Sequence, residues 1–342
     1  MKAVVITRHG GPEVLRVEER SEPRPGPGEV RIEVRAAGIN FADLMARAGT
    51  YPDAPPPPCV VGYEVAGLVE SLGDGVEGLA VGDRVVAGTY FGGYAELAVA
   101  HADSVIPLPE SFSFEEGAAI PVNYATAYAG AITMGGLRQG ERLLVHSAGG
   151  GVGIAALQLG RSVGAELFGT ASASKHEAIR AEGCQHPIDY RSTDFAQEVL
   201  RLTNGEGVDV VLDAVGPTSF RRSYRVLRPG GRLVMYGIAE LQPGPTRDLG
   251  AVVKGLARMP WATMPWWKSL AMLNENKGIA GFNLLHWWTQ EGLGRVIAPL
   301  RRLLERGELR PRVAESFPFE RAGDAHRFMM ERRNVGKVVL TP

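Results

Sequence analysis

The amino-acid sequence predicts an α/β protein that combines a β-rich domain with a doubly wound, mostly parallel sheet. Three observations predict this fold class. The 342 residues exceed the usual length of one domain. Short apolar runs bounded by glycine and proline occupy the first part of the chain, whereas apolar strands alternate with amphipathic helices beyond Pro121. A glycine run, Gly149–Gly153, stands between one of these strands and the helix after it.

The composition is ordinary for a soluble protein and excludes several classes of function. The formal net charge is −1 and charged residues make up 22%, so no basic excess indicates binding to nucleic acid. The two cysteines, Cys59 and Cys184, cannot form a four-cysteine zinc lobe or a disulfide framework. The opening MKAVVITRHGG predicts a strand and a turn rather than a signal peptide, and no long apolar run predicts a transmembrane segment. We therefore expect a cytoplasmic location.

The elements follow from the periodicity of the apolar residues. In the first part, VRIEVRAAG, YEVAGLVESLG, DRVVAGT and YAELAVA predict strands, and Pro52–Cys59 is too rich in proline for a helix. The second part predicts alternating strands and helices: strands at Leu143–His146 and Glu166–Thr170, and helices at Val152–Val163, Ser174–Glu182 and Asp194–Thr203. The change of pattern near Pro121 predicts a boundary between two domains there.

The glycine run has the setting of a dinucleotide-binding loop. It consists of Gly149, Gly150, Gly151, Val152 and Gly153, after a strand and before a helix. The glycines permit a tight turn and a close approach of the backbone to a pyrophosphate, which the N–H groups at the start of the helix attract. The alternative is a glycine-rich turn that only packs the helix on the strand, and the further β-α units make it the weaker interpretation.

The residues after the second strand of this region favour NADPH over NADH. A carboxylate that binds the ribose is expected there, but Ala171 occupies the position. Ser172, Ser174 and Lys175 follow, and their hydroxyl and ammonium groups suit a 2′-phosphate. The alternative is that Ser174 caps the next helix and Lys175 is solvated.

Longer strings carry a family resemblance that covers nearly the whole chain. AGINFADLMARAGTYP, GYEVAGLVESLGDGVEGLAVGDRV, NYATAY and NVGKVVL resemble the medium-chain dehydrogenase/reductase superfamily, and most closely its zinc-independent quinone oxidoreductases. Within these, NYATAY, GTASASKHEA, HPIDY and GPTRDL resemble the branch named after the vesicle amine transport protein. The resemblance implies a GroES-like catalytic domain over 1–122, a Rossmann NADPH-binding domain over 123–288 and a C-terminal return to the catalytic domain over 289–342.

The resemblance also implies that no metal is bound. Zinc enzymes of the superfamily carry ligands at positions that correspond here to Asn40, Tyr63 and Val122. An amide, a phenol and a valine do not form a tetrahedral zinc site. Without this Lewis acid, alcohol oxidation is disfavoured, and acceptors that take hydride readily are favoured.

By resemblance, Asn40, Asp43 and Tyr51 line the substrate cleft beside the nicotinamide, and Tyr63 is a further candidate because it stands at a zinc-ligand position. Asn40 is expected to donate its amide to an acceptor oxygen or the cofactor ribose, with Asp43 beside it; alternatively, both shape the loop and Asp43 caps a helix. Tyr51 is a candidate proton donor or an exposed loop aromatic. Tyr63 faces the same cleft or fills the space that the metal would occupy.

Further cofactor contacts are expected at the ends of the strands and near the C-terminus. By resemblance, Thr126 contacts the nicotinamide ribose or phosphate, and Tyr190 lies beside the adenosine phosphate or is a core tyrosine. The remaining candidates are Gly216, Gly237 and Ile238, which follow strands, and Asn334, whose alternative is a turn before the last strand. His146 is expected in the core.

The segment from Met259 to Trp288 contains all five tryptophans. It covers the substrate mouth, packs across a dimer, or contacts a membrane surface at Met259–Leu273; its few positive charges make lipid contact the weakest of the three. GIAGFNL is typical of an edge strand, which in this family pairs across a homodimer.

These observations predict a zinc-independent, NADPH-dependent oxidoreductase that transfers hydride to a quinone, an enone or another conjugated carbonyl. One alternative is an enoyl-thioester reductase of fatty-acid or polyketide type, which requires a positioned proton donor. Another is a nucleotide-binding protein that acts mainly by binding lipid or another partner.

Overall fold

The computed structural model describes residues 1–241, 269–288 and 294–342, and these fall into two units. The first unit contains residues 1–123, 288 and 294–342, and the second contains 124–241 and 269–287. The predicted boundaries at 122/123 and 288/289 remain predictions. The part of the tryptophan-rich segment up to residue 268 lies outside the described residues.

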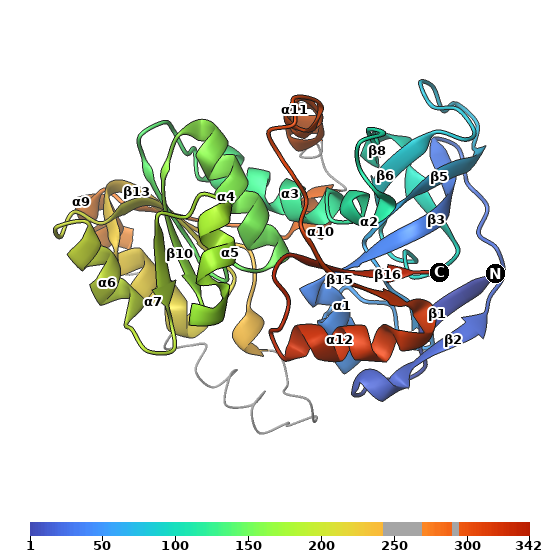
Figure 1. Cartoon of the computed structure of the whole chain (residues 1–342), viewed down its shortest axis with the longest axis horizontal. Coiled ribbons are helices and arrows are strands. Elements are labelled where there is room, and N and C mark those ends of the chain that lie inside the picture. The colour runs from blue at the N-terminus through green and yellow to red at the C-terminus, as the bar shows by residue number, and fades with distance from the viewer. Residues whose placement is uncertain (242–268, 289–293) are drawn as a thin grey trace. The chain divides into compact units, whose positions relative to one another are not determined.

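The first unit contains two sheets. A three-stranded sheet has the order β2-β1-β4, and a larger sheet has the order β15-β16-β3-β5-β6-β8, with β7 also paired to β3 (Figure 1). The strands are β1 (Lys2–Ile6), β2 (Leu15–Glu19), β3 (Glu29–Ile39), β4 (Cys59–Val60), β5 (Glu64–Leu72), β6 (Arg84–Gly88), β7 (Leu97–His101), β8 (Val105–Pro107), β15 (Val313–Pro318) and β16 (Lys337–Thr341). The helices are α1 (Phe41–Ala48), α2 (Phe114–Gly117), α11 (Gly294–Glu305) and α12 (Ala322–Met330).

The C-terminal strand β16 brings distant segments of the first unit together. It pairs antiparallel with β3, so that Val338 lies opposite Ile39 and Leu340 opposite Ala37. Val30, Ile32 and Val34 alternate along β3 and are buried, which is the pattern of a strand with one face in a core. The first unit is therefore built from both ends of the chain.

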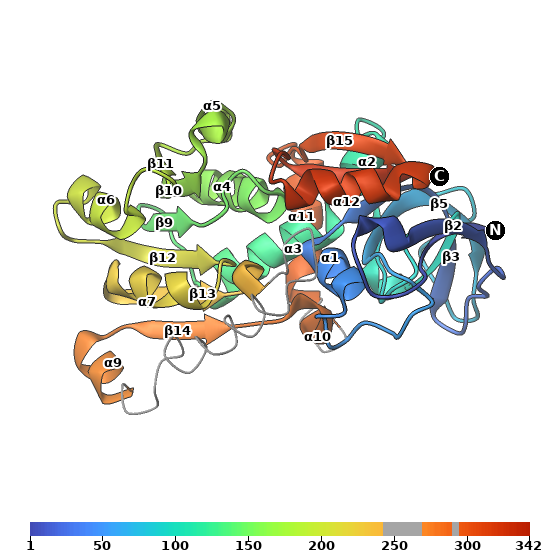
Figure 2. The same ribbon diagram turned by 90° about the horizontal axis from the view of Figure 1, so that it is seen from below.

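The second unit contains a six-stranded, entirely parallel sheet of order β11-β10-β9-β12-β13-β14 (Figure 2). Its strands are β9 (Arg142–Val145), β10 (Glu166–Ala171), β11 (His186–Asp189), β12 (Val208–Asp213), β13 (Leu227–Met235) and β14 (Gly278–Gly281). Its helices are α4 (Gly151–Val163), α5 (His176–Ala181), α6 (Phe195–Leu202), α7 (Pro217–Arg225), α9 (Ser269–Glu275) and α10 (Leu284–Trp288), and α3 (Pro121–Tyr128) contains the boundary between the units.

Both faces of the parallel sheet are covered. Leu143 and Leu167 pack against Gly160 of α4, whereas Leu144 and Phe168 belong to a core shared with residues of α6 and α7. Every residue of β12 is buried, as expected for a strand between two layers of helices. The order reverses between β9 and β12, and this switch point is where such sheets bind ligands.

The predicted fold class is confirmed, with small differences at the ends of elements. The helix predicted at Ser174–Glu182 is shorter, because a 3₁₀ turn at Ala173–Lys175 precedes α5. The predicted edge strand in GIAGFNL is β14, which lies at one end of the described sheet. Asp194 caps α6 by accepting hydrogen bonds from the backbone N–H groups of Ala196 and Gln197.

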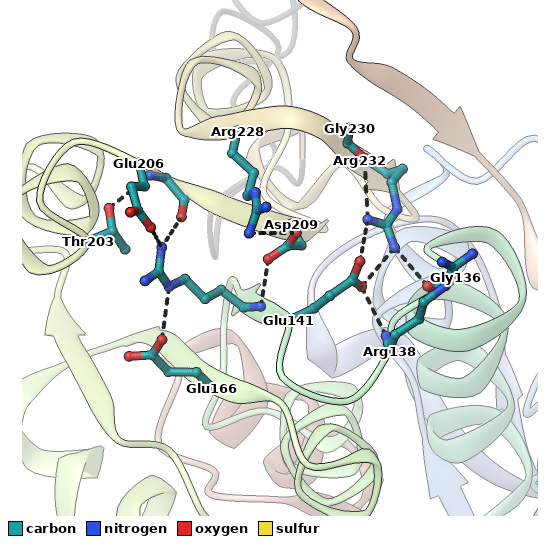
Figure 3. Close-up of polar contacts among 12 residues, drawn as sticks. Gly136, Arg138, Glu141, Glu166, Thr203, Glu206, Asp209, Arg228, Gly230 and Arg232 are labelled. Atoms are coloured by element: carbon teal, nitrogen blue, oxygen red, sulfur yellow. Dashed lines mark hydrogen bonds and ion pairs between the residues drawn. The ribbon is translucent and has the colours of Figure 1, made fainter.

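Charged residues form a network at the amino-terminal ends of the parallel strands. Arg142 at the start of β9 pairs with Glu166 at 2.9 Å and with Glu206 at 2.7 Å. Arg232 pairs with Glu141 at 3.0 Å and donates to the carbonyl of Gly136 (Figure 3). This network therefore occupies the edge of the sheet opposite the glycine run, which follows the carboxyl end of β9.

Candidate functional site

In the first unit, the loop before α1 is held by a buried carboxylate. Asp43 Oδ2 accepts a hydrogen bond from the backbone N–H of Asn40 at 2.6 Å, and Oδ1 accepts from the N–H of Gly62 at 3.0 Å. Asp43 is completely buried, and burial raises the pKa of its carboxyl group to about 7, while the two backbone donors oppose the shift. These contacts support the helix-capping alternative for Asp43.

Asn40 belongs to a buried polar cluster with Glu64 and Lys337, which we call the Asn40–Glu64–Lys337 cluster. Asn40 Nδ2 donates to Glu64 Oε1 at 2.9 Å, and Asn40 Oδ1 accepts from Lys337 Nζ at 2.7 Å. Lys337 also forms an ion pair with Glu64, and both side chains are almost fully buried. The second Asn40 Nδ2 hydrogen faces the Gly38 carbonyl at 3.4 Å. The amide of Asn40 is therefore engaged within the protein, which supports the loop-shaping alternative.

The sequence around the Asn40–Glu64–Lys337 cluster suits its close packing. A Cβ atom at Gly38 would lie 2.4 Å from the Ala118 carbonyl oxygen and 2.7 Å from Glu64 Oε1, so only glycine fits there. The second carboxylate oxygen of Glu64 accepts from the N–H of Val122 at 2.7 Å. The position that corresponds to a third zinc ligand thus contributes a backbone donor to Glu64.

Aromatic rings connect the other two catalytic candidates. The rings of Tyr51 and Tyr63 meet edge to face with centroids 6.2 Å apart, and Tyr63 also contacts Phe91 at 5.2 Å. Tyr63 is buried, and its hydroxyl has no hydrogen-bond partner within the described residues. Burial raises the pKa of this phenol, with Asp43 adding to the shift, so Tyr63 stays protonated. The structure thus brings Asn40, Asp43, Tyr51 and Tyr63 together in one unit.

In the second unit, the glycine run begins helix α4. Gly150 is the N-cap, and the 13-residue helix starts at Gly151, so the free N–H groups of its first turn adjoin the run. A Cβ atom at Gly153 would lie 2.4 Å from the Ser147 carbonyl oxygen. Gly153 therefore permits the close contact between the helix and the loop before it. The backbone of Ser147 has φ of +54°, an uncommon value for serine.

Lys175 lies against the glycine run. A Cβ atom at Gly149 would lie 2.8 Å from Cδ of Lys175, so the aliphatic part of this side chain covers Gly149. Ser172 follows β10 directly, and its hydroxyl lies 3.3 Å from that of Ser174. The structure therefore brings Lys175 to the glycine run, whereas the hydroxyls of Ser172 and Ser174 contact each other, and the 2′-phosphate role of all three stays a prediction.

The other cofactor candidates of the second unit mostly follow strands. Gly216 lies beyond β12, and its backbone φ is +134°. Gly237 packs on Ala214. The Ala214 carbonyl accepts a hydrogen bond from the N–H of Ala239, the residue that follows Ile238. Tyr190 follows β11 and is 40% exposed, so the alternative of a core tyrosine is wrong. Thr126 is buried in α3.

Asn334 lies in the first unit, in the turn before β16. Its side-chain amide donates to the Gly336 carbonyl at 2.9 Å. This contact supports the turn alternative, and its role as a cofactor contact stays a prediction.

Sequence reasoning missed Glu64 and Lys337. Both lie in strings that carried the resemblance, GYEVAGL and NVGKVVL, but alternation along a strand predicts only that one face is buried. Nothing in the local sequence indicates that two charged residues 273 positions apart (337 − 64) form a buried pair. A charged residue within each of these two strand-forming strings is the one sequence signal that could have drawn attention to Glu64 and Lys337.

The family is shown by comparison with known proteins. Residues 26–110 match the alcohol dehydrogenase GroES-like domain, and residues 182–340 match the family described as zinc-binding dehydrogenase. The synaptic vesicle membrane protein VAT-1 homolog of Rattus norvegicus is 40% identical over 351 aligned positions, which cover 100% of this chain and 84% of the relative. The chain belongs to the medium-chain dehydrogenase/reductase family, on the branch of the VAT-1 homologues.

Solved structures of related enzymes cover the whole fold. The CurK enoyl reductase has a TM-score of 0.85 at 30% identity, over 99% of this chain and 98% of that one. A quinone oxidoreductase of Pseudomonas syringae has a TM-score of 0.83 at 32% identity, over 100% of this chain and 99% of that one. The mycobacterial protein Rv1454c, solved with NADPH, has a TM-score of 0.84 at 31% identity, over 100% of both chains. The chain is thus an oxidoreductase of the NAD(P)-binding dehydrogenase class.

The described residues contain no cluster of three or more His, Cys, Asp or Glu side chains that could hold a metal ion. None of the helices in the described ranges is long and apolar enough to cross a membrane.

Proposed function

We propose that this protein is a zinc-independent, NADPH-dependent oxidoreductase that transfers hydride to a quinone or another conjugated carbonyl. The observation that carries the proposal is the covering of Gly149 by the Lys175 side chain at the start of α4. It supports a site in which helix N–H groups and a glycine turn hold the pyrophosphate while Lys175 holds a 2′-phosphate. The NADPH complex of the related mycobacterial protein supports the same choice of cofactor.

The residues at the former zinc-ligand positions support metal-independent chemistry. The amide of Asn40 is bonded to Glu64 and Lys337, the Tyr63 phenol is buried, and Val122 contributes only its N–H. NADPH, when bound, supplies the hydride. Protein residues then need only to orient the acceptor, and the hydroxyl of Tyr51 is our candidate for polarising its oxygen.

The test is NADPH oxidation by chelator-treated protein, followed at the absorbance of the reduced nicotinamide. An ortho-quinone, a simple enone and an enoyl thioester are offered separately. We expect fast turnover of the quinone with NADPH and slow turnover with NADH. Binding of NADPH without turnover of any acceptor would instead favour a protein that acts by binding a partner.

Lys175→Ala tests the choice of cofactor. Loss of a charge-assisted hydrogen bond costs about 1.5–3 kcal/mol, so KM for NADPH should rise roughly 10- to 100-fold, with little change for NADH. Arg180→Ala is the matched control, because it removes one exposed positive charge from the helix that follows. Equal effects of Lys175→Ala on the two cofactors would contradict the phosphate role.

A specific observation favours the enoyl-thioester alternative as the second candidate. This reaction needs a proton donor, and the Tyr63 hydroxyl is protonated, buried and without a hydrogen-bond partner in the described part of the chain. The CurK enoyl reductase is also structurally similar. If Tyr63 is that donor, Tyr63→Phe should lower kcat for the thioester by at least tenfold and leave quinone turnover nearly unchanged.

We also propose a homodimer that pairs two copies at β14. This strand ends the described sheet, and Leu270 and Leu273 of the adjacent α9 are 73% and 71% exposed. Pairing would cover the strand edge and these apolar side chains. Light scattering should show a dimer that Leu270→Glu with Leu273→Glu dissociates; Val81→Glu, at a residue 66% exposed in the first unit, is the control. The cytoplasmic location stays a prediction.

A further inference from the structure

A chain of buried polar side chains runs beneath the carboxyl ends of three neighbouring strands. His146 follows β9, Thr170 is in β10, and Asp213 ends β12. Ser223 of α7 completes the chain, and all four side chains are at least 97% buried. We call it the His146 chain; the predicted oxidoreductase chemistry uses none of its members.

With a neutral imidazole, which the burial of His146 favours, the hydrogen bonds of the His146 chain have only one consistent direction. Ser223 Oγ donates its one hydrogen to Asp213 Oδ2 at 2.7 Å, so it must accept from His146 Nε2 at 2.9 Å. His146 is then the neutral Nε2–H form, and its Nδ1 accepts from the hydroxyl of Thr170 at 3.0 Å. Burial lowers the pKa of His146 and Arg222 adds to this, whereas Asp213 opposes it.

One end of the His146 chain reaches the loop that precedes the glycine run. Thr170 Oγ1 donates its hydrogen to His146 Nδ1, so it can accept from the backbone N–H of Ser147, which lies 3.4 Å away. The Thr170 carbonyl also accepts from the N–H of Ala148 at 3.0 Å. Ser147 is the residue with positive φ, and its carbonyl accepts from Gly150 N–H at 2.9 Å and lies against Gly153.

The other end holds the turn after β12. Asp213 Oδ1 accepts from the N–H of Val215 and from the hydroxyl of Ser219, both at 2.8 Å. The Ser219 hydroxyl also lies 2.9 Å from the Gly216 carbonyl. The chain thus joins the two loops on either side of the switch point between β9 and β12.

We infer that the His146 chain is a positioning device that fixes the glycine run relative to the Gly216 turn for nucleotide binding. The inference rests on the proposed nucleotide function and names the residues that preorganise it. Burying four polar groups costs free energy unless all are hydrogen-bonded, and here each one is. Because the His146 chain ends at the backbone N–H of Ser147, it carries no proton to a substrate. Its effect is therefore on cofactor affinity rather than on proton transfer.

The experiment compares two buried threonines of the same unit. Thr170→Val removes the hydroxyl that connects His146 to Ser147, and Thr170→Ser restores it. Thr203→Val is the matched control, since the Thr203 hydroxyl is equally buried and the described residues that it bonds, Val199, Leu200 and Gly207, lie around the end of α6. The dissociation constant of NADPH, kcat, KM for NADPH and urea unfolding are measured for each variant.

We expect Thr170→Val to weaken NADPH binding and to raise KM for NADPH about tenfold with little change in kcat. Thr170→Ser should recover affinity to within about twofold of the original protein. Thr203→Val should lose stability without losing affinity. Unchanged NADPH affinity in Thr170→Val, or an equal loss in Thr203→Val, would overturn the inference.

A second measurement does not depend on NADPH. In ¹⁵N NMR spectra of the unmodified protein, His146 should be the neutral Nε2–H tautomer from pH 6 to 8. The amides of Ser147 and Ala148 should exchange faster in Thr170→Val than in Thr203→Val. The opposite tautomer, or unchanged exchange, would reject the positioning role. Failure of the original protein to bind NADPH would reject the proposed cofactor. The tautomer and the amide exchange rates would then still test whether the His146 chain positions the glycine run.

Discussion

Two of the sets of oppositely charged side chains in this molecule have different surroundings. In the first unit, Lys337 and Glu64 are 3% and 0% exposed and share Asn40. In the second unit, Arg142 is 24% exposed and its partner Glu206 is 65% exposed, within the network of Figure 3. The same kind of pair is therefore kept from water in one place and hydrated in the other.

The difference teaches that burial, rather than distance, decides what a pair contributes. Removal of one member of a buried pair leaves an uncompensated charge in a medium that solvates it poorly. Removal of a member of an exposed pair lets water take its place. Both sets have contacts below 3.0 Å, yet we expect them to respond differently to substitution, pH and salt.

The largest effect is expected from Lys337→Met. The substitution leaves Glu64 charged and buried, with only Asn40 and the Val122 N–H as donors. We expect the free energy of unfolding to fall by about 3–5 kcal/mol, measured by urea denaturation. The double variant Glu64→Gln with Lys337→Met should recover part of this loss, because it removes the remaining charge. A double variant less stable than Lys337→Met would contradict this account.

The next effect concerns pH and the Asp43 carboxyl group. Its pKa in the folded protein is about 7, against about 3.9 in an unfolded chain. Folding therefore takes up a proton between these values, so the stability that Asp43 contributes is complete below about pH 4 and is lost as pH rises to 7. The difference in stability between the original protein and Asp43→Asn should fall across this window.

Urea denaturation at several pH values measures this difference. The opposite trend would mean that the carboxylate form is the one held by the N–H groups of Asn40 and Gly62. The comparison with Asp43→Asn cancels the titration of the other groups, since both proteins contain them.

A smaller effect is expected from Arg142→Met. The substitution removes the side-chain contacts with Glu166 and Glu206, but the backbone N–H at position 142 still donates to Asp209. The free energy of unfolding should fall by about 1 kcal/mol or less, because both carboxylates are exposed to water. A loss as large as that of Lys337→Met would show that the network of Figure 3 behaves as a buried one.

The smallest effect is that of salt. Raising the NaCl concentration from 0.05 to 0.5 M screens exposed charges and leaves buried ones nearly unaffected. The cost of Arg142→Met should therefore shrink, while the cost of Lys337→Met stays the same. Urea denaturation of both variants at the two concentrations measures this, and an equal response would remove the distinction between the two regions.

The sequence by itself determined the elements that depend on local pattern. The alternation of apolar runs and helices predicted the parallel sheet, and the glycine run predicted the loop at the start of α4. The residues at Asn40, Tyr63 and Val122 predict metal-independent chemistry, and this stays a prediction. These features can be read from neighbours along the chain because backbone conformation and hydrophobic periodicity are local properties.

Only the tertiary structure decided which polar side chains meet. Asn40 and Lys337 are 297 positions apart, and His146 and Ser223 are 77 apart. Periodicity placed His146 in the core but did not indicate that its ring nitrogens bond two hydroxyls from other elements. Such pairings depend on the register of β16 against β3 and on the packing of α7, which no local pattern encodes. The physical reason is that a buried polar group needs a partner, and the fold selects it from segments distant in sequence.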